Sequence, residues 1–128
     1  MNFVPINPTS DIYQATPDYI HAIAIDAPHR LLFVSGTMGL DTDRRPADTI
    51  DGQLRLIWRN ISTILQEAGG DIDSVVRVTS YLRDRDYMQA NQDARVRALG
   101  GRVVPCTTIV AETLSEDWLV EVEIIAAL

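Results

Sequence analysis

Two glutamates near the carboxyl end are the acidic residues of this sequence best placed to do acid–base chemistry. Glu121 and Glu123 alternate with Val120, Val122 and Ile124 in the most apolar segment of the chain. Side chains in a strand point to opposite faces in turn, so both carboxylates are expected on one face, opposite the valines and isoleucine. That face is either solvated or part of a pocket in which a carboxylate acts as a general acid or base. The alternation alone leaves both possibilities open.

The single cysteine is the candidate nucleophile. Cys106 follows Pro105 at the start of an expected strand. A lone cysteine is either a small buried apolar residue or a nucleophile, and a nucleophile needs a neighbouring base or cation that lowers its pKa. His21 is a possible base, although the sequence does not place it near the thiol. His21 and His29 have no second histidine or cysteine at metal-ligand spacing, so no metal site is expected.

The composition excludes several chemistries. All 11 basic residues are arginines, which excludes a lysine Schiff base and therefore pyridoxal-phosphate and aldolase-type imine chemistry. The 18 acidic residues give a net charge of −7, which argues against binding to a nucleic-acid backbone. One cysteine can form neither an internal disulfide nor a cysteine-rich metal site.

Length and hydropathy predict where the protein works. The 128 residues fit a single domain, 1–128. The first twenty residues lack a basic segment followed by an apolar run, so no secretory signal is expected. No stretch approaches the roughly 18 consecutive apolar residues of a membrane span. The sequence therefore predicts a cytoplasmic protein that does not interact with membranes.

Short apolar runs predict five strands. The expected strands cover residues 18–26, 31–37, 74–82, 105–113 and 118–127. The first two are separated by a short turn segment and are expected to pair as a hairpin. Residues 38–49 are polar and are expected to form a loop.

Two segments have helical spacing. Apolar residues recur every three or four positions over 54–68, with Asp48 or Asp51 as the expected cap and a stop at Gly69-Gly70. A second helix is expected over 86–99. Its predicted apolar face is Tyr87, Ala90, Ala94 and Leu99.

The order β-β-α-β-α-β-β predicts an α+β fold with a mixed sheet. Two helices can cover only one face of such a sheet, and the other face is partly apolar. Oligomerisation is the simplest way to cover it.

The motifs resemble those of the reactive-intermediate deaminase family (Rid, or YjgF/YER057c/UK114) over residues 17–128. LLFVSGT is similar to the family's LLFVSGQ, and VEVEIIAAL is similar to IEIEAIA. EAGGDIDSVVRVTSYLRDRDYMQAN resembles EAAGASLDDVVKVTVYLTDMDDFAAVN almost throughout. Gln53 and Asn60 stand where the family's first helix carries a glutamine and an asparagine.

The resemblance implies a chorismate-mutase-like fold that assembles as a homotrimer with a central barrel. Active sites would lie in clefts between subunits. There an enamine or imine, such as 2-aminoacrylate or its imine tautomer, would be hydrolysed to a 2-oxo acid and ammonia without a cofactor. Glu121 would position the attacking water. The ligand-binding positions would be Tyr19, Gly36, Thr37, Asn91 and Thr107.

One position departs from the family. The family reads PAR[ST] where this chain has Val104-Pro105-Cys106-Thr107. In the family the arginine that binds the substrate carboxylate precedes the glutamate by 15 residues, and 121 − 106 is also 15. Cys106 therefore takes the arginine's place, and Arg102 is the nearest arginine that could substitute for it.

The substitution predicts an altered function. The first hypothesis is a Rid-type hydrolase or deaminase with another substrate, including one without an α-carboxylate, in which Cys106 either lines the pocket or acts as a nucleophile. The alternative is a non-catalytic Rid homologue that binds or senses a small molecule. RNA cleavage fits the net charge least.

Overall fold

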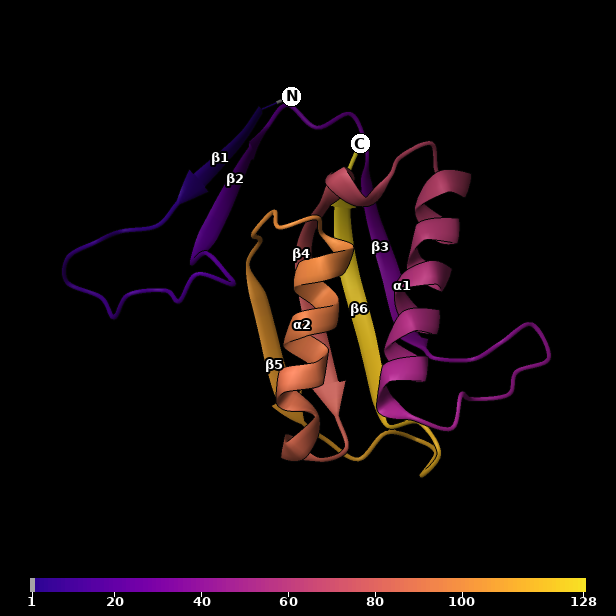
Figure 1. Ribbon diagram of the computed structural model, residues 1–128. Coiled ribbons are helices and arrows are strands. Elements are labelled where there is room, and N and C mark those ends of the chain that lie inside the picture. Colours follow the sequence, from indigo (N-terminus) through magenta and orange to yellow (C-terminus); the bar gives the residue numbers. More distant parts are fainter. Residues whose placement is uncertain (1) are drawn as a thin grey trace.

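Four strands form the central sheet of the structure, a computed structural model that describes residues 2–128 (Figure 1). Their order across the sheet is β3-β6-β4-β5. The bounds are β3 (Leu31–Met38), β4 (Val75–Leu82), β5 (Cys106–Val110) and β6 (Val120–Ala127). β4 and β5 run parallel, whereas β3 and β4 each run antiparallel to β6. The sheet is therefore mixed, as predicted.

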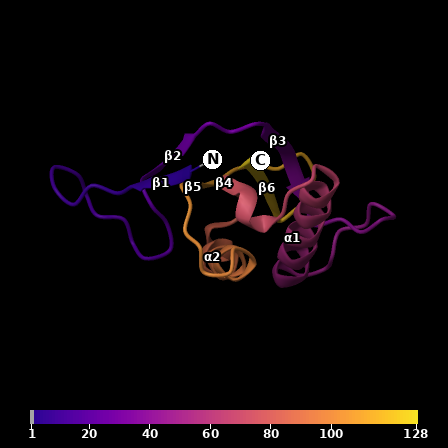
Figure 2. The ribbon, with the colours of Figure 1, turned by 90° about the horizontal axis from the view of Figure 1, so that it is seen from above.

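Both helices lie on one face of this sheet, and Figure 2 shows the other face without helices. They are α1 (Ile50–Glu67) and α2 (Met88–Ala98), and short 3₁₀ turns at Ile72–Ser74 and Arg85–Tyr87 precede β4 and α2. Side chains of α1 and of alternate positions in the strands form the core between them. Its fully buried members include Leu54, Ile57, Ile61, Leu65, Val78, Val120, Val122 and Ile124. The predicted α+β arrangement with one covered face is confirmed.

The N-cap of α1 differs from the prediction, whereas the predicted stop at its C-terminal end is confirmed. α1 is capped by Thr49, whose hydroxyl accepts a hydrogen bond from the Gly52 amide, and neither Asp48 nor Asp51 is the cap. Thr49 is therefore the N-cap residue, and its side chain satisfies one of the free backbone amides of the first helical turn. After the helix, Gly69 has a φ of 87°, a left-handed conformation that suits glycine, as predicted for the stop.

The inner face of α2 is more polar than predicted. The predicted apolar face does contact the core, with Leu99 buried and Tyr87, Ala90 and Ala94 partly buried. Within α2 itself, however, the buried residues are Asn91 and Arg95. Spacing of apolar residues could not reveal this, because a buried arginine needs a partner from a distant part of the chain.

The predicted hairpin between the first two strands is wrong. β2 (Ala22–Asp26) pairs with an additional strand, β1 (Asn2–Ile6), in a separate two-stranded ribbon. Residues 27–30 carry the chain away from this ribbon, and Arg30 and Leu128 exchange backbone hydrogen bonds that fix the start of β3 beside the end of β6. Figure 1 shows the ribbon beyond β5, on the opposite side of the sheet from β3. β3 and β5 are therefore the two edge strands of the main sheet.

Within residues 2–128, the structure contains no helix with both the length and the apolar character needed to cross a membrane.

Candidate functional site

The first group of candidate residues lies where β3 meets β6. Glu121 is paired with Met38 across the two strands, and its carboxylate lies directly over Gly36. A Cβ added at Gly36 would stand 2.2 Å from Glu121 Oε2. Glycine at this position therefore leaves the space that the carboxylate occupies.

A β-bulge shapes the same stretch of β3. The pairing register shifts between Val34 and Thr37. Thr37 is nearly buried, and its hydroxyl donates to the Ser35 carbonyl oxygen at 3.0 Å. Bulges redirect a strand locally. Gly36 and Thr37 therefore lie in an irregular stretch of β3 beside Glu121.

The two glutamates share the face without helices, as the alternation predicts. Burial raises the pKa of Glu121, and the charge of Glu123 raises it further. Glu123 accepts a hydrogen bond from the Tyr81 hydroxyl at 2.5 Å, so its carboxylate already has a partner. The pKa of Glu121 is therefore shifted toward the neutral range in which a general base works.

α1 and the loops around it hold this first group in place. The Gln53 side chain is fully buried and donates to the carbonyl oxygens of Ala47 and Asp117, while its own oxygen accepts from the Leu119 amide. Asn60 donates to the carbonyl oxygen of Leu40 at 3.1 Å. Both amides therefore bind backbone next to β3 and β6, which explains their place in α1.

The second group lies at β5, on the other edge of the sheet. Cys106 is half-buried and packs against the core, so it points to the face covered by the helices. Burial raises the pKa of the Cys106 thiol, and Arg95 opposes that shift only in part. The thiol is therefore protonated at neutral pH, and nucleophilic attack requires the thiolate.

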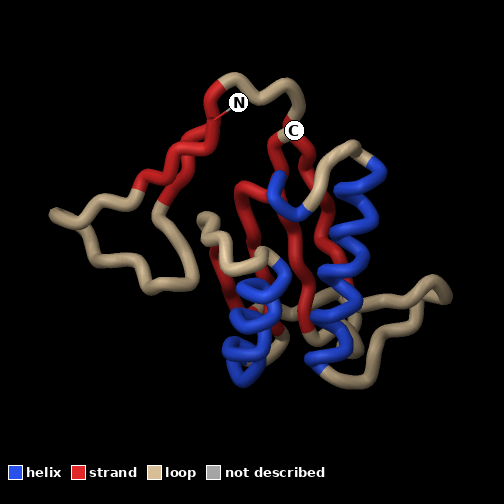
Figure 3. Tube along the Cα trace, turned by 45° about the horizontal axis from the view of Figure 1, so that its top comes forward, coloured by secondary structure: helices blue, strands red, loops and turns tan. Residues whose placement is uncertain are grey.

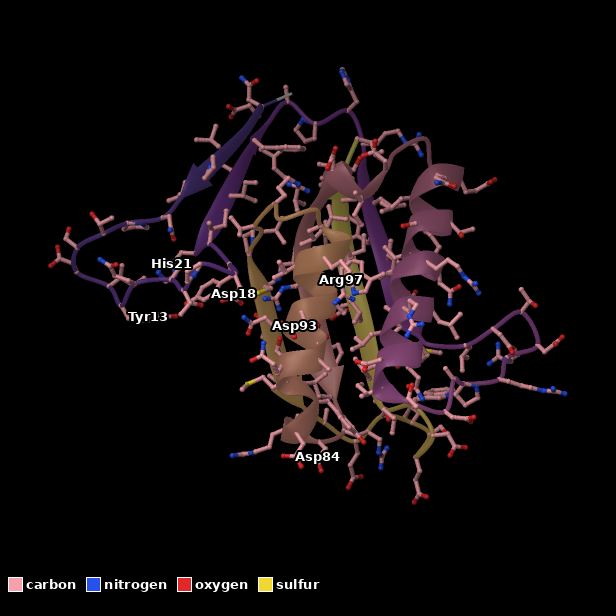
Figure 4. All side chains as sticks on the ribbon, viewed as in Figure 1. Tyr13, Asp18, His21, Asp84, Asp93 and Arg97 are labelled. Atoms are coloured by element: carbon pink, nitrogen blue, oxygen red, sulfur yellow. The ribbon has the colours of Figure 1, made fainter. Side chains whose placement is uncertain are left out.

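Tyr19 belongs to this second group. Its pKa is raised, first by burial and then by its neighbours Tyr13, Asp18 and Cys106. The His21 ring lies edge-on to Tyr19, with ring centroids 5.9 Å apart, and to Tyr13 at 5.1 Å. Figure 4 shows Tyr13 and His21 close together in the segment before β2. His21 is thus a member of an aromatic cluster, with its Nε2 atom 2.8 Å from the Tyr13 carbonyl oxygen.

An ion pair that the sequence did not reveal joins this segment to α2. Arg95 Nη2 lies 2.6 Å from Asp18 Oδ2, and the Arg95 side chain is 4% exposed. The other oxygen of Asp18 accepts from the Thr16 hydroxyl at 2.5 Å. Figure 4 shows Asp18 directed from its loop toward the main body. No short-range pattern predicts this pair, because its partners are 77 residues apart in the chain.

The remaining predicted residues are placed as follows. Asn91 is fully buried on α2, one helical turn before Arg95, and neither polar atom of its side chain has a hydrogen-bond partner among residues 2–128. Thr107 accepts a hydrogen bond from Arg77 at 2.8 Å. Arg102 donates to the backbone oxygen of Val75 and lies over the Phe3 ring. The Arg102 guanidinium is therefore engaged by the backbone at the start of β4 and by β1.

The chain does not bring the two groups together. Glu121 and Gly36 lie on the face without helices near β3, whereas Cys106 and Tyr19 lie at β5 on the covered side. Figure 3 shows the loops next to them, 7–21 and 39–49, projecting on opposite sides of the sheet. The predicted site residues therefore form two separate groups, one near the β3 edge of the sheet and one near the β5 edge.

No group of three or more potential metal ligands occurs in the part of the chain that the structure describes.

Comparison with known proteins identifies the family. The family model for endoribonuclease L-PSP matches residues 9–128. The chain belongs to the Rid family. This Rid chain is 31% identical over 100 residues to a Lactococcus lactis protein named as the putative regulator AldR, covering 75% of this chain and 78% of that one.

Two further similarities concern sequence and fold. Reactive Intermediate Deaminase A of Arabidopsis thaliana chloroplasts is 31% identical over 67 residues, which are 50% of this Rid chain and 36% of that protein. The crystal structure of YyfB from Yersinia pestis, a Rid family protein of unknown function, matches with a TM-score of 0.85 at 21% identity, and the match covers all of both chains. At that identity the match establishes the fold alone, and it includes the region of the N-terminal ribbon.

Proposed function

We propose that this Rid chain is a cofactor-independent hydrolase that releases ammonia from an enamine or imine whose binding does not depend on the family arginine. The observation that carries the proposal is the Glu121 carboxylate lying over Gly36 with a raised pKa. In the proposed reaction Glu121 takes a proton from water, and the water oxygen bonds to the imine carbon. Protonated Glu121 then returns that proton to the nitrogen of the resulting tetrahedral carbinolamine. The C–N bond breaks as the hydroxyl proton passes to the departing nitrogen, which gives a carbonyl and ammonia.

The other residues would shape and line the cleft. Tyr19, Thr37 and Thr107 offer hydroxyl groups to the ligand, and Gly36 offers its backbone. Cys106 would line the cleft as a neutral thiol, because burial keeps its pKa above the ordinary value. The buried amide of Asn91 has no hydrogen-bond partner in the described part of the chain, which supports a polar role toward the ligand or its surroundings.

We propose further that the complete site forms between copies of the chain. The two halves lie at the two free edges, β3 and β5. An interface that joins the β3 edge of one copy to the β5 edge of the next is head-to-tail, and such an interface forms a ring when the rotation between copies closes. Each contact would place one copy's Glu121 near the next copy's Cys106 and Tyr19. A homotrimer is the ring that the family resemblance implies, and the predicted cytoplasmic location stays a prediction.

The open sheet face offers a direct test of this assembly. Phe33 is 70% exposed in β3, so Phe33→Asp should place charges in the proposed interface and leave the fold intact. We expect the unmodified protein to elute near three times its 14.2 kDa chain mass in size-exclusion chromatography with light scattering, and the variant to elute as a monomer. Leu114→Asp is the control, because Leu114 is 96% exposed in a loop outside the strands. A monomeric unmodified protein would refute the inter-subunit cleft.

The function itself is tested by ammonia release. The purified protein is given a panel of imines generated in the assay, half with an α-carboxylate and half without. We expect release above the uncatalysed rate for members without the carboxylate, and full retention of that activity in Cys106→Ala. Binding of panel members without release of ammonia would refute the hydrolase.

A small-molecule binder is the second candidate. It is supported by Cys106, which stands where the resemblance implies an arginine, and by the similarity to a relative named as a regulator. It predicts that a ligand raises the melting temperature while no imine is consumed.

A further inference from the structure

The ion pair of Asp18 and Arg95 lies beside the residue that replaces the family arginine. Arg95 is buried on α2, and Cys106 packs against the core that the helices cover. Both charges of the ion pair act on the pKa of the Cys106 thiol, which Arg95 lowers and Asp18 raises. Tyr19, which follows Asp18 in the chain, is affected by the same thiol. A guanidinium therefore exists next to position 106, although it comes from α2 and not from β5.

This guanidinium is already bound to a carboxylate of the chain. The Asp18–Arg95 contact is 2.6 Å, and the side chains are 18% and 4% exposed, respectively. The more exposed aspartate therefore lies on the solvent side of the buried arginine. Thr16 holds the second oxygen of Asp18, which fixes the carboxylate in this position. A ligand carboxylate at this guanidinium would therefore have to compete with Asp18.

We propose that Asp18 occupies the place of a ligand carboxylate at Arg95 and thereby makes this cleft select ligands that carry no carboxylate. The inference rests on the proposed function only in taking the Tyr19–Cys106 group as part of the ligand cleft. Two physical effects would make the cleft prefer ligands without a carboxylate. Asp18 satisfies Arg95 in the absence of ligand, and its own negative charge repels a second carboxylate.

The proposal makes Asp18 a specificity-determining residue, and Asp18→Asn is the variant that tests it. The substitution keeps the shape of the side chain and leaves Arg95 without a charged partner. Butanoate and its neutral analogue butanamide serve as probes, and NMR titration of the purified protein measures both dissociation constants. We expect the unmodified protein to prefer butanamide. The variant should bind butanoate about 10-fold or more tightly than the unmodified protein does, as expected for a charge-assisted contact.

Two further variants separate this role from a merely structural one. Asp93→Asn changes the net charge equally and removes an α2 carboxylate that lies outside the ion pair; it should leave butanoate affinity unchanged. Asp18→Asn with Arg95→Gln should lose the gain. Butanoate should also raise the melting temperature of Asp18→Asn and not that of Asp93→Asn, and added salt should weaken the effect.

The outcomes are decisive in both directions. If Asp18→Asn and Asp18→Ala are folded and bind butanoate no better than the unmodified protein does, the proposal is refuted. A gain in butanoate affinity supports it even when no imine releases ammonia, a result that would refute only the hydrolase. Ammonia release without any gain in affinity would refute only the role of Asp18.

Discussion

Glu121→Gln is expected to lower the rate of ammonia release by about 100- to 10,000-fold, the usual contribution of a general base. The amide keeps the size of the side chain over Gly36, but it cannot accept a proton from water. Ligand affinity should change little, because the proposed role concerns water. Steady-state kinetics on the active imine should therefore show the loss in kcat, with KM nearly constant.

The neighbouring carboxylate provides the control. Glu123 lies on the same face, but it accepts the Tyr81 hydrogen bond and does not lie over Gly36. Glu123→Gln should retain most of the activity. Equal losses in both variants would contradict a specific role for Glu121 and indicate a general effect of charge on this face.

The pH dependence of this residue has a definite sign. The pKa of Glu121 is raised above its ordinary value of 4.5, mainly by burial, so kcat should rise with pH through that raised pKa. Stability changes in the opposite sense. The contribution of Glu121 to folding is fully present below the unfolded-state pKa and is lost as pH rises through the folded-state pKa. Glu121→Gln should remove both dependences.

Gln53→Leu is expected to be the most destabilising exchange of a polar side chain in α1. The side chain makes three hydrogen bonds to backbone groups of two separate loops, and it is 2% exposed. Leucine fills similar space but leaves those backbone groups without partners. We expect a loss of about 3 kcal/mol in the free energy of unfolding, measured by urea denaturation.

A second glutamine on the same helix is the matched control. Gln66 is exposed near the end of α1, so Gln66→Leu should change the free energy of unfolding by less than about 0.5 kcal/mol. If the two variants were equally stable, the Gln53 hydrogen bonds would contribute nothing net. Because Leu119 lies two residues before Glu121, the Gln53 variant should also lose activity under conditions in which it is still folded.

The layered part of the fold was predictable because its signals are local. Alternation placed Glu121 and Glu123 together on one strand face, and spacing every three or four residues located α1. The pairing of the N-terminal strands was not predictable. Nearness in sequence favoured a hairpin with β3, whereas Leu128 binds Arg30 and β1 binds β2. Those contacts depend on chain ends that no short window contains.

The sequence predicted individual residues of the candidate site but not which of them lie together. Alternation and the single thiol led to Glu121 and Cys106, and the family resemblance added Gly36 and Tyr19. The structure shows these four residues in two separate groups. Asp18 and Arg95 escaped notice for a physical reason. A buried charge is recognisable only with its partner, and this partner comes from a segment 77 residues away.

The separation of the two groups also has a consequence for how mutant alleles of the protein behave together. In a ring of the proposed kind, each copy contributes its Glu121 half to one cleft and its Cys106 half to the next. A copy damaged in only one half would still serve its other neighbour. Two alleles with defects in different halves could therefore complement each other when expressed together, whereas two alleles defective in the same half could not.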